Sequence, residues 1–181
     1  MLKINFLKKE VFLEKGCFCS DLIIKSFKPS NTIIAGYASV FGVLDSQNDV
    51  IIKGAFKSIE ARNVKLLWQH DPRKPIGVIK SLSEDEYGLK FEAEINNSIE
   101  AGREASELIK QKAICGLSIG FSINSSSYDE KGMRVISDVN LIEISVVTFP
   151  ANNQAEITYV KSRNNSPLDE LSHLVKQLKE Y

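Results

Sequence analysis

Apolar and polar residues alternate along much of this chain, and the alternation is clearest over residues 115–124. Four apolar residues there alternate with four small ones: Gly116, Leu117, Ser118, Ile119, Gly120, Phe121, Ser122 and Ile123. Because successive side chains of a strand point to opposite faces, this segment predicts a strand with one apolar and one small-residue face. Glycine weakens a strand, so the glycines beside Ser118 indicate open space next to its hydroxyl. That space suits a nucleophile approached by a substrate backbone, or alternatively a second element packed on the small residues.

Other segments show either the strand period or the helix period. Strands are predicted at 22–24, 32–41, 64–69, 75–82, 88–95, 134–139, 141–149 and 155–160. Helices are predicted at 53–62, 98–112 and 168–179, where apolar residues recur every three or four positions. So many strands in a chain of 181 residues predict a mostly β fold with helices, of the α+β class. We expect a closed or partly closed antiparallel barrel surrounded by a few helices.

The C-terminal part of the chain differs from the strand-rich part. Residues 162–167 are polar and lack apolar periodicity, and they precede the amphipathic segment 168–179. We therefore predict a barrel domain over 1–161, followed by a linker and an amphipathic helix over 162–181. Linkers of this kind are preferred sites of proteolytic nicking because their backbone can leave the surface and extend.

Composition limits the classes of partner. Lys+Arg and Asp+Glu number 23 each, so the chain lacks the excess of basic residues that would indicate nucleic-acid binding. No apolar run reaches transmembrane length, and the first 14 residues lack the apolar core of a signal peptide. Three cysteines argue against a disulfide framework, and Cys17 and Cys19 have no second Cys/His pair with which to hold a metal. We therefore expect no nucleic acid, membrane, metal or cofactor as a partner.

The segment 116–120 matches G-x-S-x-G, the nucleophile elbow of α/β-hydrolases. That elbow needs a strand before the serine and a helix after it, whereas here a helix is predicted before the serine and a strand continues beyond it. The fold also needs a histidine after the serine, and His173 is the only one there. Since His173 lies off the apolar stripe of 168–179, it is better explained as a solvated residue. We reject the α/β-hydrolase interpretation.

Two other polar residues could act with Ser118. His70 ends a predicted apolar strand, and strand ends often present side chains to a site. Glu143 stands within an apolar strand, where a carboxylate is costly unless it is paired. Two roles are open for Glu143: it could hold an imidazole in the tautomer that acyl transfer needs, or form a structural ion pair, for example with Arg134 or Arg103.

Five blocks of sequence, in order and at plausible spacing, resemble the tailed-phage prohead (capsid maturation) proteases. They are GYASVF at 36–41, Asp45 with DVIIKGAF at 49–56, LWQHD at 67–71 with PIG at 75–77, GLSIGF at 116–121, and EISVVT at 143–148 with PAN at 150–152. The resemblance covers about 32–160. This family is similar to herpesvirus assemblin, a barrel with surrounding helices whose site has the order histidine, serine, histidine. By position, the resemblance implies His70, Ser118 and Glu143 as catalytic residues, with Glu143 departing from the assemblin pattern.

The resemblance implies a serine endopeptidase inside the immature capsid, in the host cytoplasm. Such an enzyme would cut scaffold or capsid-protein segments and also itself, and it is compatible with a homo-oligomer. For this chain we expect self-cleavage between residues 160 and 168, in the polar linker. The alternatives are a non-catalytic capsid-assembly or scaffolding barrel, in which Ser118 is a packing residue, and a serine hydrolase that cuts esters.

Overall fold

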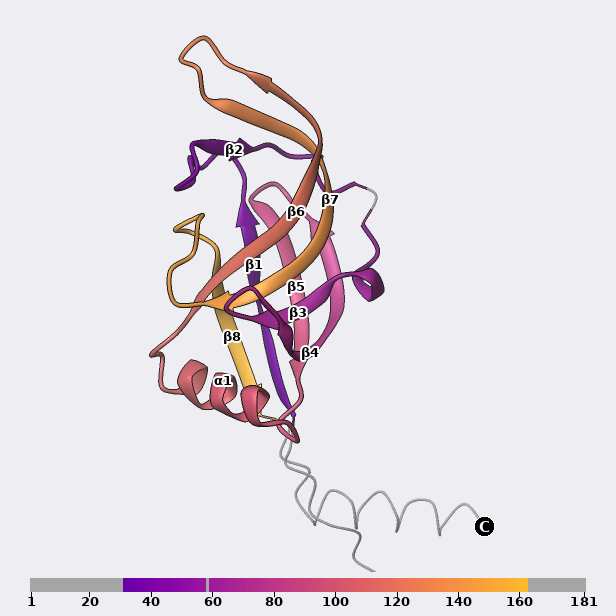
Figure 1. Ribbon diagram of the computed structural model, residues 1–181, viewed down its shortest axis with the longest axis vertical. Helices are drawn as coiled ribbons and strands as arrows, with labels where there is room; N and C mark the ends of the chain where they lie inside the picture. The colour runs from indigo at the N-terminus through magenta and orange to yellow at the C-terminus, as the bar shows by residue number, and fades with distance from the viewer. Residues whose placement is uncertain (1–30, 58, 163–181) are drawn as a thin grey trace, which may run out of the picture.

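The computed structural model describes residues 31–57 and 59–162 (Figure 1). The elements are β1 (Thr32–Val40), β2 (Asp49–Ile51), the 3-10 helix η1 (Ala61–Asn63), β3 (Lys65–Trp68), β4 (Asp71–Glu84), β5 (Gly88–Ile95), α1 (Glu100–Lys110), β6 (Gly116–Tyr128), β7 (Arg134–Val147) and β8 (Glu156–Ser162). The helix predicted at 98–112 is confirmed as α1. The predicted strand at 22–24 and the predicted linker and helix after β8 lie outside the described residues.

Seven strands close into a barrel in the order β7-β3-β4-β5-β1-β8-β6, and β6 pairs back with β7. β2 lies outside this ring and pairs with the first residues of β7. The predicted strand-rich barrel is therefore confirmed. Most neighbours are antiparallel, but β3 and β2 run parallel to β7. Because parallel strands end at the same edge, the turn after β3 lies beside the C-terminal half of β7.

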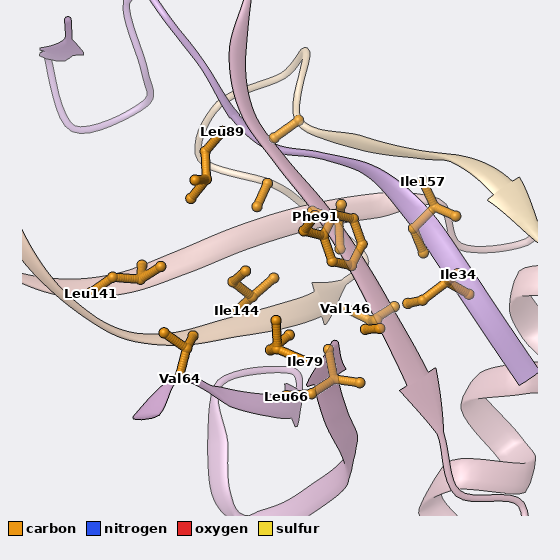
Figure 2. Packing of buried hydrophobic residues seen from close by; sticks show 14 of the residues in the cluster. Ile34, Val64, Leu66, Ile79, Leu89, Phe91, Leu141, Ile144, Val146 and Ile157 are labelled. Atoms are coloured by element: carbon orange, nitrogen blue, oxygen red, sulfur yellow. The ribbon is translucent and has the colours of Figure 1, made fainter. Parts of the chain in front are cut away.

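The barrel interior is filled by apolar side chains from every strand of the ring. Figure 2 shows part of this core, with labelled residues on β1, β3, β4, β5, β7 and β8. On β7, Ile144 and Val146 are fully buried in this core. Strand alternation then places Glu143 and Ser145 on the opposite, outer face of β7. The same alternation on β6 directs Leu117 into the core and Ser118 outward. The core thus determines that Ser118, Glu143 and Ser145 share one outer face.

The β6–β7 hairpin is longer than its sequence pattern predicted. The two strands predicted at 134–139 and 141–149 are one continuous strand, β7, and β6 continues to Tyr128. Register shifts along this pairing let the strands bend without ending. The hairpin extends beyond the rest of the sheet at the top of Figure 1, and α1 lies near the other end.

The prediction of a helix over 53–62 is wrong. Gly54 has a φ of 94°, outside the helical region. The backbone N–H groups of Gly54 and Phe56 donate to Glu84 Oε1 on β4, at 3.1 and 3.0 Å. Ala55 and Phe56 are buried, so this segment is fixed by burial and by a distant carboxylate. Only the short helix η1 forms near its end.

Among the helices in the described part of the chain, none has the length and apolar character needed to cross a membrane.

Candidate active site

His70 lies in a tight turn between β3 and β4. β3 ends at Trp68 and β4 begins at Asp71, so Gln69 and His70 alone form the connection. Their φ angles are 54° and 59°, positive as the central residues of a type I′ turn require. Residues other than glycine seldom adopt this conformation, although asparagine, aspartate and histidine do so more often than the rest, and it costs conformational energy. Strain of this kind persists only where surrounding contacts hold it.

Those contacts come from the end of β7. The Gln69 backbone N–H donates to the Val146 carbonyl at 3.0 Å. The Gln69 side-chain amide donates to Thr148 Oγ1 at 2.9 Å and accepts the Thr148 backbone N–H at 3.2 Å. The His70 backbone N–H donates to Ser145 Oγ at 3.1 Å. The turn is therefore fastened to β7 by both of its residues.

Glu143 contacts the imidazole of His70. The distance from His70 Nδ1 to Glu143 Oε1 is 2.6 Å, within hydrogen-bonding range. The other oxygen, Oε2, accepts a hydrogen bond from the Ser145 hydroxyl, with 2.7 Å between Oγ and Oε2. Glu143 is 8% exposed, so these two partners compensate a nearly buried carboxylate. An Nδ1–H that donates to the carboxylate leaves the His70 Nε2 lone pair free, and this is the tautomer of a general base.

The alternative partners considered for Glu143 are not used. Arg134 forms a bidentate pair with Asp49 on β2, at 2.7 and 2.6 Å. This pair raises the pKa of Arg134. In residues 31–57 and 59–162, no ion pair joins Glu143 to Arg103. Asp71, the carboxylate next to His70, pairs with Arg73, whose hydrogen bonds hold the pKa of Asp71 below its ordinary value.

Ser118 lies on β6 directly opposite Ser145 of β7. It lines a cavity of about 290 Å³, and His70 lines the same cavity. Other lining residues come from the end of β1, the 43–51 segment and the loop after β7: Ser39, Asp45, Asp49, Ile51, Ala151 and Asn152. Within the described residues, no hydrogen bond joins the Ser118 hydroxyl to the His70 ring. Catalytic hydrogen bonds of unliganded enzymes are often long and tighten only when substrate binds.

The glycines beside Ser118 do not leave empty space. A Cβ on Gly120 would lie 2.4 Å from Glu143 Oε1, and one on Gly116 would lie 2.9 Å from Pro150 Cδ. Gly120 therefore makes room for the Glu143 carboxylate, and Gly116 for the loop after β7. Of the two explanations open from the sequence, these contacts favour a second element packed on the small residues over open space for a substrate backbone.

Sequence reasoning did not identify Ser145 or Gln69, whose side chains lie between the turn and β7. For Ser145 a signal existed, because residues i and i+2 of a strand share a face and Ser145 is two positions from Glu143. For Gln69 there was none, since its partner Thr148 is 79 residues away. Among the described residues, no cluster of three or more His, Cys, Asp or Glu side chains could hold a metal ion.

Comparison with known proteins adds sequence relatives and a structural neighbour. The family described as Caudovirus prohead serine protease matches residues 20–170. The prohead protease of Enterobacteria phage HK97 is 36% identical over 137 residues, which are 72% of this chain and 60% of that protein. The prohead protease of Escherichia phage T5 is 34% identical over 154 residues, 80% of this chain and 72% of that protein. This chain thus spans less than two thirds of the HK97 relative.

The fold is similar to that of KSHV protease, solved in complex with a hexapeptide phosphonate inhibitor. The TM-score is 0.53, the sequence identity is 11%, and the similarity covers 83% of this chain and 77% of that one. At this identity the likeness concerns the fold alone.

Proposed function

This chain belongs to the caudovirus prohead serine protease family, and from that premise we propose that it is a serine endopeptidase of capsid maturation. The observation that carries the proposal is the 2.6 Å contact between His70 Nδ1 and Glu143 Oε1, beside a cavity that Ser118 also lines. A packing role for Ser118 would need neither a histidine held by a carboxylate nor a shared cavity. The contact therefore favours catalysis over the alternative, a non-catalytic capsid-assembly barrel.

The proposed mechanism assigns one role to each residue. Ser118 Oγ attacks the carbonyl carbon of the scissile peptide bond while His70 Nε2 takes its proton. Glu143 holds Nδ1–H and stabilises the imidazolium that forms. The tetrahedral intermediate then collapses, and His70 returns the proton to the leaving amine. Water attacks the acyl-enzyme by the same route, releasing the new carboxyl end and restoring the Ser118 hydroxyl.

The proposed substrates follow from the relatives. Both phage relatives are named prohead proteases. We therefore propose scaffold or capsid-protein segments as substrates, cut inside the immature capsid in the host cytoplasm. We also propose that the chain cuts itself between residues 160 and 168, which would separate a barrel domain, 1–161, from the segment 162–181. β8 reaches Ser162, so the expected cleavage lies at or just after the end of the barrel sheet.

The test compares wild type with Ser118→Ala and with Ser122→Ala, an exposed serine of the same strand, as matched control. A fluorophosphonate should label wild type and Ser122→Ala at Ser118 and should not label Ser118→Ala. Intact mass followed over time should show loss of the segment after the cleavage site in wild type and Ser122→Ala, and no loss in Ser118→Ala. A folded wild type that neither reacts at Ser118 nor cleaves any prohead protein would favour the assembly-barrel alternative. Turnover of esters without peptides would favour the second alternative, an esterase.

A further inference from the structure

We propose that Ser145 is a positioning residue that couples the His70 turn to the Glu143 carboxylate. The inference rests on the proposed function, because it assigns to Ser145 the task of holding the proposed base and its partner in register. Ser145 lies on β7, is fully buried, and is no part of the cavity lining. It is therefore not a second nucleophile, although it stands directly opposite Ser118.

The polarity of the two hydrogen bonds fits a bridge. A serine hydroxyl has one proton to donate and lone pairs with which to accept. Ser145 donates that proton to Glu143 Oε2 at 2.7 Å and accepts the His70 backbone N–H at 3.1 Å. An ionised carboxylate can only accept and a backbone N–H can only donate, so neither bond can reverse. One hydroxyl thus joins both members of the proposed acid–base pair.

The bridge determines how the carboxylate is oriented. The terminal torsion of a glutamate is broad, so a single hydrogen bond leaves the plane of the carboxylate free to turn. With Ser145 on Oε2, the other oxygen, Oε1, is directed at His70 Nδ1, 2.6 Å away. Without the hydroxyl, Oε2 would lose its donor in a side chain that is nearly buried. The carboxylate would then rotate toward any other donor or toward solvent.

The bridge also supports a backbone conformation that His70 would otherwise leave. His70 has a φ of 59°, and Ser145 accepts its backbone N–H. The neighbouring residue Gln69 is held separately, by Val146 and Thr148. Loss of the Ser145 hydroxyl would therefore loosen the half of the turn that carries the imidazole and leave the other half in place. A base displaced by about 1 Å can lose on the order of 100-fold in rate.

The experiment compares Ser145→Ala with Ser106→Ala. Ser106 is an equally buried serine on α1, and its hydroxyl donates to Asn97 Oδ1 at 2.6 Å, away from the cavity. Both variants lose one buried hydroxyl, so both should have a lower melting temperature than wild type. Only Ser145→Ala should also lose fluorophosphonate labelling per folded molecule, by about 10- to 100-fold.

A second readout does not depend on activity. An imidazole N–H that donates to a carboxylate forms a short, strong hydrogen bond, and its proton is observed at low field by NMR. The chain has only two histidines, so the resonance that is lost in His70→Ala belongs to His70. The resonance should move upfield or broaden beyond detection in Ser145→Ala and stay unchanged in Ser106→Ala. If Ser145→Ala does not fold, Ser145→Cys is measured in its place, since its thiol occupies the position of the hydroxyl but is a weak donor.

The outcomes separate this proposal from the proposed function. An unchanged resonance and unchanged labelling in the Ser145 variant would overturn the positioning role and make Ser145 a structural residue like Ser106. A wild type without labelling at Ser118, but with a resonance that shifts in Ser145→Ala, would overturn the proposed function and leave the coupling of Ser145 to the pair intact.

Discussion

Replacement of Gly120 by alanine should disable the site without unfolding the barrel. The added Cβ would lie 2.4 Å from Glu143 Oε1, 2.9 Å from its Cγ and 3.0 Å from its Cδ. Ordinary contacts of a Cβ begin at 3.4 Å, so Oε1 would have to move by about 1 Å. Oε1 is the atom that contacts His70 Nδ1 at 2.6 Å, so the same movement disturbs that hydrogen bond.

The size of the effect follows from what is displaced. A shift of about 1 Å at a positioned catalytic group costs roughly 100-fold in rate, and we expect a loss of that order in Gly120→Ala. The cost in stability is smaller. One hydrogen bond to a charged group is worth about 1.5–3 kcal/mol, while alanine in place of a strand glycine recovers about 0.5–1 kcal/mol. The net destabilisation of about 1–2 kcal/mol lowers the melting temperature by only a few degrees.

The assay is the rate of fluorophosphonate labelling at Ser118 per folded molecule, combined with the melting temperature. A double-mutant cycle supplies the control. In a Glu143→Ala background the clash has no partner, so adding Gly120→Ala should change the remaining labelling rate little. The reasoning would be refuted by wild-type labelling in Gly120→Ala. An equal loss with and without the Glu143 side chain would also refute it, because the alanine would then act through another contact.

Two further predictions concern single carboxylates. Glu143→Gln should lower the labelling rate by as much as about 10⁴-fold and leave the melting temperature near normal. The reason is that His70 Nδ1–H and the Ser145 hydroxyl both donate to this side chain, and an amide has only one accepting end. A lowered melting temperature with normal labelling per folded molecule would remove Glu143 from the proposed triad. Asp85 has its pKa lowered by the Tyr37 hydroxyl, so its contribution to stability is complete above the ordinary pKa of an aspartate and is lost as pH falls through the lower folded value. Chemical unfolding from about pH 5 to about pH 2 should show the advantage of wild type over Asp85→Asn shrinking with falling pH, and a constant difference would contradict this.

Local pattern was sufficient to predict most of the elements and the candidate residues. Alternation predicted the strands around Ser118 and Glu143, because side-chain direction in a strand depends only on position along it. The helix α1 was predicted from apolar residues that recur every three or four positions, because side-chain direction in a helix also depends only on position along it. The candidates were also few, since the whole chain has two histidines and Glu143 is the carboxylate inside the strongly apolar segment 141–149.

Tertiary structure decided what those residues contact. His70 and Glu143 are 73 positions apart, and they meet because β3 runs parallel to β7, a pairing that no local period encodes. The contact between Ser145 and the His70 turn depends on the same pairing, because these residues are 75 positions apart. It also hid the use of Gly120, whose missing side chain makes room for the carboxylate of a neighbouring strand. The segment 53–62 has a helical period but folds otherwise, because Glu84 on another strand binds its backbone N–H groups. Periodicity determines which face a side chain occupies, whereas strand order and register, set by burial of the whole core, determine which atoms lie opposite it.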